Sequence, residues 1–148
     1  MISLCSGWEF TPRWTDDFPL GAGEYETVRL PHTVREVPLH YALPEHYETV
    51  CGYRRALDIP ASYAGKRIFI RFDGAAHIAT LFVNGTELLT HRCGYTAFAA
   101  DISALVVPGG ENSVAVRLDC TENPEVPPFG FVIDYLTYGG LYREAWLD

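Results

Sequence analysis

Apolar and polar residues alternate along this chain with the period of β-strands, and long stretches with the helical period are nearly absent. In 53–59 every second residue from Tyr53 is predicted to share one face, and Pro60 ends the strand because proline has no N–H for a ladder. Further strands are predicted at 68–73, 79–83, 86–90, 114–119 and 141–147. The alternation is clearest in 114–119, where Val114, Val116 and Leu118 are predicted to face a core.

Two local signals join these strands. Asn84-Gly85 predicts a two-residue hairpin between 79–83 and 86–90, because a type I′ turn needs positive φ at both central positions. With Thr86 the same residues form a glycosylation sequon, but we interpret them as a turn. Asp101 is predicted to cap a single helical turn.

The pattern contains about eight strands with turn signals every ~10 residues, which is typical of an all-β sandwich or barrel. We therefore expect one domain spanning 1–148, without repeats or internal linkers. Two longer segments break this rhythm: 31–52, rich in His, Tyr, Glu and Pro, and 120–140, rich in Pro and Gly. Loops of this length in a compact domain usually serve function.

Composition excludes several classes of protein. The chain has 148 residues, too few for a (β/α)₈ barrel, which needs roughly 250. Its formal net charge of −8 leaves no basic stripe, so we expect no nucleic-acid partner, and an acidic surface also repels anionic membranes. Aromatic residues reach 14 %.

The beginning of the chain has no basic or long apolar stretch, which predicts a cytoplasmic protein without a secretory signal or membrane span. Cys5, Cys51, Cys93 and Cys120 have no zinc-type spacing and are interpreted as free thiols. Five scattered histidines give no metal or acid–base pattern: His32, His40, His46, His77 and His91. We expect no metal and no cofactor.

Several short motifs occur in a fixed order along nearly the whole chain: 30–33 (LPHT), 52–55 (GYRR), 65–74 (GKRIFIRFDG), 83–85 (VNG), His91 with 94–96 (GYT), Phe98 with 101–102, 112–119 and 138–143 (YGGLYR). As an ordered set they resemble the N-terminal domain of glycoside hydrolase family 2, which includes β-galactosidases, β-glucuronidases and β-mannosidases. The resemblance implies a jelly-roll β-sandwich of the galactose-binding type. It also implies an excised N-terminal, non-catalytic domain of a larger glycosidase.

The same resemblance implies the partners. In the full-length protein, a retaining β-glycosidase of β-galactosidase type, an immunoglobulin-like domain would follow. The catalytic Glu pair would lie in a barrel absent from this chain. The domain would then form part of the active-site wall for a β-glycoside and pack on the barrel; an oligomer is possible. The sugar and linkage stay open among galactose, glucuronate and mannose.

Asp134 is the site residue that the resemblance supplies. The stretch 134–143 is similar to the family's acidic and aromatic loop, whose acid in β-galactosidase-like members reaches the barrel and helps to bind the glycone. A fixed carboxylate suits sugar hydroxyls. A cap or an ion pair with a neighbouring Arg is the alternative. Glu48 stands near the place where galactosidase members often carry Asn-Pro, so the match fails there and no role is transferred.

The other side chains of the long segments leave two interpretations open. The carboxylates are Glu45, Glu48, Asp119, Glu122 and Glu125, and nothing in the sequence pairs any two of them as a retaining glycosidase would require. They are also explained as solvated loop acids. The aromatic residues are Tyr41, Tyr47, Phe129, Phe131, Tyr135 and Tyr138, which suit either sugar faces or packing against the sandwich and partner domains.

Three functions remain in competition at this point. The first is the non-catalytic jelly-roll domain of a family 2 glycosidase. The second is a stand-alone carbohydrate-binding module, because jelly rolls also host lectins. The third is a structural domain that mediates oligomer contacts.

Overall fold

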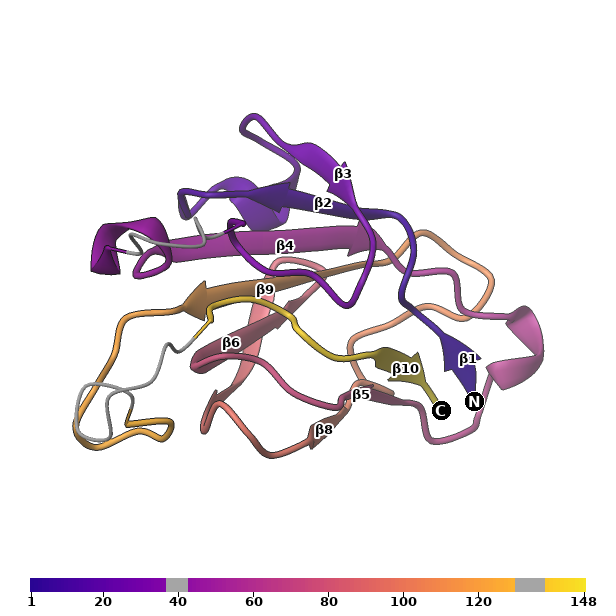
Figure 1. Ribbon diagram of the computed structural model, residues 1–148. Helices are drawn as coiled ribbons and strands as arrows, with labels where there is room; N and C mark the ends of the chain where they lie inside the picture. Colours follow the sequence, from indigo (N-terminus) through magenta and orange to yellow (C-terminus); the bar gives the residue numbers. More distant parts are fainter. Residues whose placement is uncertain (37–42, 130–137) are drawn as a thin grey trace.

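The computed structural model describes residues 1–36, 43–129 and 138–148, and within them the chain forms two antiparallel sheets that face each other (Figure 1). The six-stranded sheet has the order β3-β2-β4-β9-β6-β7, and the four-stranded sheet has the order β1-β10-β5-β8. The strands are β1 (Ile2–Ser3), β2 (Trp8–Thr11), β3 (Glu26–Val28), β4 (Val50–Ala56), β5 (Phe69–Phe72), β6 (Ile78–Val83), β7 (Thr86–Arg92), β8 (Phe98–Asp101), β9 (Ser113–Asp119) and β10 (Ala145–Leu147). The prediction of an all-β sandwich is confirmed.

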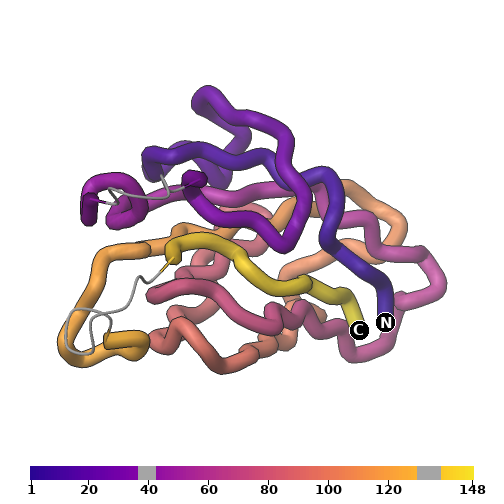
Figure 2. Tube along the Cα trace, viewed as in Figure 1, coloured from indigo at the N-terminus to yellow at the C-terminus, as the bar shows by residue number. Residues whose placement is uncertain are grey.

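In the described residues three short 3₁₀ turns connect the strands: η1 (Phe18–Leu20), η2 (Pro44–His46) and η3 (Ala61–Tyr63). The chain begins and ends side by side in the four-stranded sheet, where Ile2 pairs with Leu147 (Figure 2). Within the described parts of the chain no helix has the length and apolarity to cross a membrane.

The core lies between the inward faces of the two sheets. Val114, Val116 and Leu118 of β9 are fully buried, as the alternation predicts. Trp8 of the six-stranded sheet packs on Phe72 of the four-stranded sheet with 6.1 Å between ring centroids. Aromatic contacts of this kind add to the hydrophobic effect that holds the layers together.

The outer face of the six-stranded sheet is also covered, which the sequence did not predict. Ala115, expected to face outward from β9, is only 2 % exposed. The segment 12–25 crosses this face: Trp14 stacks on Phe82 at 5.3 Å between ring centroids. Phe18 also lies so close to Gly52 that a Cβ there would be 3.0 Å from its ring. The segment closes one face that a simple inside–outside alternation leaves open.

The hairpin prediction is confirmed. Asn84 has φ 49° and Gly85 has φ 77°, as a type I′ turn requires, and β6 pairs with β7 on either side of the turn. Asp101 accepts hydrogen bonds from the backbone N–H and the hydroxyl of Ser103, so it caps a turn, although this turn is not a helix.

Two strand boundaries differ from the prediction. The strand expected at 53–59 occupies Val50–Ala56 instead, because its ladder follows β9 from Val50↔Asp119 to Ala56↔Ser113. Leu57 and Ile59 are buried beyond the ladder, which explains the misleading alternation. The strand expected at 141–147 is confined to Ala145–Leu147.

Candidate functional site

One end of the sandwich collects most of the chain segments that the sequence singled out. In the six-stranded sheet Val50 pairs with Asp119, Asp119 with Ile78, and Ile78 with Arg92, so these residues form one row across four strands. The segments that leave this row therefore start at the same edge of the sheet. We call 43–49, 73–77, 93–97, 120–129 and 138–140 together the loop end (Figure 1, left side).

Gly139 and Gly140 fix one root of the loop end. Gly140 exchanges both backbone hydrogen bonds with Ala76, at 3.0 and 3.2 Å. On its other side the His32 N–H donates to Leu141 O at 2.9 Å. A Cβ at Gly140 would collide with the His32 carbonyl oxygen and with Thr33 Cα, so the close approach of three chain segments needs glycine here.

Next to this crossing, the buried Tyr53 pairs with the partly buried His32. Tyr53 Oη lies 2.8 Å from His32 Nδ1, and the Leu141 backbone N–H points at the same phenol oxygen. Burial lowers the pKa of His32, which keeps its ring neutral, and burial raises the pKa of Tyr53 well above its usual range. The two side chains thus share a hydrogen bond between neutral groups, and the pair holds 32–34 against 139–141.

The turn after β7 carries a second polar cluster. His91 Nε2 lies 3.0 Å from Thr96 Oγ1, and its ring stacks on Phe98 at 4.5 Å. Burial raises the pKa of the Cys93 thiol, but hydrogen bonds from the Thr96 hydroxyl and from the backbone of Tyr95 and Thr96 outweigh it. The Cys93 pKa therefore lies below its ordinary value, and this turn favours negative charge.

The structure brings the predicted loop acids to one end of the sandwich. It does not establish any two of them as the carboxylate pair of a retaining glycosidase. Glu45, Glu48, Asp119, Glu122 and Glu125 all lie in the loop end or in the row beside it. Asp134, the predicted substrate-binding residue, lies outside the described residues, as do His40, Tyr41, Phe131 and Tyr135.

The aromatic residues of the loop end divide between packing and exposure. Tyr47 is buried, whereas Phe129 is 37 % exposed and Tyr138 is 51 % exposed. Phe129 and Tyr138 are therefore available to a sugar or to another domain, and Tyr47 packs inward. In the described parts of the chain no group of three or more His, Cys, Asp or Glu side chains is placed to hold a metal ion.

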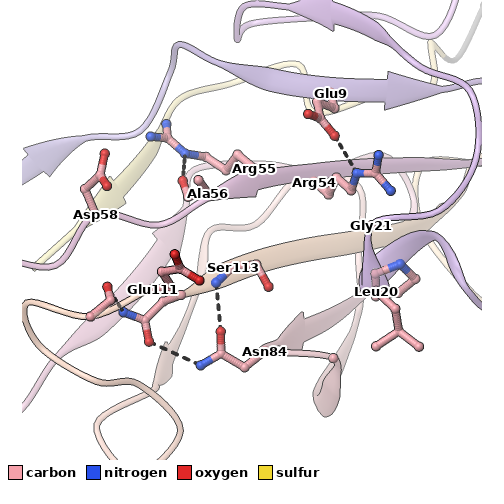
Figure 3. A pocket seen from close by; sticks show the side chains of 14 residues that line it. Glu9, Leu20, Gly21, Arg54, Arg55, Ala56, Asp58, Asn84, Glu111 and Ser113 are labelled. Atoms are coloured by element: carbon pink, nitrogen blue, oxygen red, sulfur yellow. Dashed lines mark hydrogen bonds and ion pairs between the residues drawn. The ribbon is translucent and has the colours of Figure 1, made fainter.

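A groove of about 660 Å³ lies at the opposite end of the six-stranded sheet, and no sequence-predicted site residue lines it (Figure 3). Arg54 borders it and is held by Glu9 and by the carbonyls of Phe18 and Ala22. Asn84 donates to Asn112 Oδ1 at 3.2 Å and accepts from the Ser113 N–H at 2.8 Å. The hydrogen-bonding groups of these side chains are used within the protein. We therefore interpret them as residues that hold loops against the sheet and not as a ligand site.

These structural roles of the motif residues were not predicted from the sequence. Loops are connected to strands by Arg54 of GYRR, Asn84 of VNG and Asn112. His32 of LPHT forms a hydrogen bond with Tyr53. Polar residues next to alternating strands were the available signal, but only the fold shows which carbonyls they meet.

The fold is a two-sheet antiparallel β-sandwich whose loops gather at one end. The profile described as "Glycosyl hydrolases family 2, sugar binding domain" matches residues 4–147. The chain belongs to this family.

Relatives and solved structures agree. The chain is 40 % identical to a β-galactosidase of Thermoanaerobacterium thermosulfurigenes over 99 % of its own length and 21 % of the relative's. It is 38 % identical to a β-glucuronidase of Bacteroides fragilis, over 84 % of this chain and 18 % of that protein. The crystal structure of a Bacteroides uniformis β-glucuronidase superposes with a TM-score of 0.85 at 28 % identity, covering 98 % of this chain and 17 % of that one. The chain thus spans about a fifth of the length of the curated relatives it matches.

Proposed function

We propose that this chain is the non-catalytic sugar-binding domain of a retaining β-glycosidase of β-galactosidase type. Its loop end forms one wall of the active-site cleft, and its sandwich packs on a catalytic barrel that carries the Glu pair. β-Galactosidase relatives at 36 % and 40 % identity support this assignment. The chain spans only a small part of the length of those relatives, which is consistent with a domain that does not carry the catalytic residues.

The observation that carries the proposal is the loop end itself. Five carboxylates and the exposed rings of Phe129 and Tyr138 are concentrated at one end of the sandwich. Carboxylates accept hydrogen bonds from sugar hydroxyls, and aromatic rings pack against sugar C–H faces. The Gly139–Gly140 crossing holds the root of this end by backbone hydrogen bonds, so its side chains are presented from a fixed base.

Asp134 is assigned within this proposal to the glycone. In the parent enzyme, Asp134→Ala removes one charge-assisted hydrogen bond to substrate, and kcat/KM for a β-galactoside is expected to fall about ten- to a hundred-fold. The melting temperature is expected to stay near the wild-type value. Asp58→Ala is the matched control, because Asp58 is an exposed acid beside the groove at the opposite end.

Kinetics and melting curves of the three proteins, measured side by side, test the assignment. Unchanged kcat/KM in Asp134→Ala contradicts a role in substrate binding. A collapse of its melting temperature makes Asp134 a structural residue instead.

A β-glucuronide is the second candidate substrate, favoured by the relatives named β-glucuronidase. Nitrophenyl β-galactoside and nitrophenyl β-glucuronide, compared on the same parent enzyme, decide between the two. A higher kcat/KM on the glucuronide overturns the β-galactosidase assignment and leaves the domain's place in the cleft intact.

A further inference from the structure

His77 is a fully buried polar side chain that the proposed function does not use. It is 1 % exposed, and neither ring nitrogen makes a hydrogen bond of normal geometry among the described residues, although the Cys120 backbone lies close enough to favour the charged ring. Burying an unpaired polar group costs free energy that an apolar ring of similar size would avoid. What the imidazole adds over such a ring is the ability to take up a proton near neutral pH.

His77 lies where three segments of the loop end meet. Its backbone N–H donates to Asp119 O at 3.0 Å, and the preceding residue, Ala76, exchanges backbone hydrogen bonds with Gly140. Across the ring is Gly94, where an added Cβ would be 3.1 Å from His77 Nδ1 and 2.5 Å from Pro128 Cδ. No side chain fits between the imidazole, the Gly94 turn and the Pro127–Pro128 stretch.

Hydrogen bonds complete this contact, which we call the Gly94 seat: Gly94, Pro127, Pro128 and the His77 ring. The Gly94 N–H donates to Pro127 O at 2.8 Å. The Tyr142 hydroxyl donates to Gly94 O from the other side. The seat therefore connects the turn after β7 to the 120–129 segment, and the imidazole packs against Gly94 in it.

Carboxylates stand near the ring and favour its charged form. Burial lowers the pKa of His77, while Glu122 and Asp119 act in the opposite direction. The titratable groups on the elements around the ring are Asp119 at the end of β9, Cys120 and Glu122 after it, Cys93 in the turn after β7, and Tyr142 before β10. The ring is thus neutral in the seat at neutral pH, and acid carries it toward an imidazolium whose charge Glu122 and Asp119 favour.

We propose that His77 is a positioning residue for the substrate-facing loop end: its neutral ring seats Gly94 against Pro127 and Pro128, and its protonation in acid releases this seat. An imidazolium carries a charge and two N–H donors, and the closed seat around the buried ring offers them no hydrogen bond of normal geometry among the described residues. The inference rests on the proposed function, because only a loop end that faces substrate connects the seat to catalysis.

The direction of the pH effect follows from the burial of the ring. A buried histidine resists protonation, so the seat stays closed above the ordinary histidine pKa of 6.5 and opens as the pH falls below it. The reacting groups lie on another domain, so opening is expected to weaken substrate binding and to leave the chemical step nearly unchanged. KM should respond to pH more than kcat does.

The test compares the parent enzyme with its His77→Gln, His77→Phe and His91→Gln variants. KM and kcat for nitrophenyl β-galactoside are measured from about pH 4.5 to about pH 7.5, around the histidine range. In the wild type KM is expected to rise about fivefold toward acid, a coupling of ordinary size. The rise is expected to persist in His91→Gln, which removes a partly exposed histidine of the same end, and to vanish in both His77 variants.

Hydrogen exchange of a peptide spanning 91–98 gives a second readout, because it reports the Gly94 N–H···Pro127 bond directly. Its protection factor is expected to fall in acid for the wild type and to be independent of pH in the His77 variants. Melting curves at neutral pH identify which His77 variant is folded, and His77→Phe keeps the ring shape if glutamine does not pack.

Two outcomes overturn the inference: a protection factor that does not change with pH in the wild type, or an acid-dependent KM that survives in a folded His77 variant. A different pattern of results distinguishes a failure of the proposed function from a failure of this inference. If protection depends on His77 while KM does not change with pH, the Gly94 seat is supported and the placement of the loop end in the substrate cleft is wrong.

Discussion

Gly140 shows at the residue scale why the loop end depends on backbone contacts. Its φ of 134° lies outside the range that side chains favour, and an added Cβ would meet backbone atoms of His32 and Thr33 rather than a flexible side chain. The two neighbouring segments cannot give way without breaking the Ala76 and Leu141 hydrogen bonds. The cost of a side chain here is both conformational and steric.

Gly140→Ala is therefore expected to lower the free energy of unfolding by about 2–4 kcal/mol. Gly21→Ala is the matched control: Gly21 also has positive φ, 99°, but nothing lies within 4 Å of its added Cβ. That control is expected to cost only about 1 kcal/mol. Urea unfolding of the three proteins measures the difference, and equal losses for the two variants would show that the crossing at Gly140 is not tight.

Single residues of the site could be predicted only partly from the sequence. Glu45, Glu48 and Glu122 were recognised as loop acids, and their gathering at one end required the strand register that places Val50, Asp119 and Ile78 in one row. His77 gave no signal, because its meaning comes from contacts with Gly94 and Pro128, which are far from it in sequence. The assignment of Asp134 stays a prediction.

At the scale of elements, alternation predicted strands that have one apolar face and enough length. β9 fulfils both conditions, and its predicted core face of Val114, Val116 and Leu118 is buried. β1, β3 and β10 are only two or three residues long, too short for a period to be read. The burial of Ala115 needed the 12–25 segment, whose place over the sheet depends on Arg54 and not on any local pattern.

Arg54 is the link between this segment and the sheet. Its guanidinium donates to Glu9 and to the carbonyls of Phe18 and Ala22, and it lies 4.3 Å from the centroid of the Phe18 ring. Arg54→Met leaves a partly buried Glu9 and two carbonyls without their donor. The free energy of unfolding is expected to fall by about 2–4 kcal/mol, slightly less than for a fully buried pair because Glu9 is partly exposed.

Arg67→Met is the control for this prediction. Arg67 also pairs with a carboxylate, Asp101, but its side chain is 76 % exposed, so its loss is expected to cost less than about 1 kcal/mol. Trp14 fluorescence reports whether the segment leaves Phe82 in Arg54→Met. A loss in Arg54→Met no larger than in Arg67→Met would contradict the role of Arg54 as the lock of this segment.

At the scale of the whole molecule, the two ends of the sandwich differ in what they have left to bind. Both ends expose carboxylates, Asp58 and Glu111 among them at the groove, but the groove end uses Arg54 and Asn84 for internal hydrogen bonds, whereas the loop end also presents the exposed rings of Phe129 and Tyr138. The chain termini pair with each other in the four-stranded sheet. In the proposed function the loop end supplies only one side of a site, and this determines how the isolated domain should behave.

The isolated chain is therefore expected to hydrolyse no glycoside and to bind simple sugars weakly. One wall of a cleft keeps only part of the contacts that bury a ligand, whereas a self-sufficient binding module surrounds it. Calorimetric titration with galactose, glucuronate and a β-galacto-oligosaccharide is expected to give dissociation constants weaker than about 100 µM. The parent enzyme, titrated in parallel, should bind the same sugars more tightly. Tight binding by the isolated chain would favour a lectin-like module, and turnover of nitrophenyl glycosides that copurifies with the chain and disappears on unfolding would contradict a non-catalytic domain.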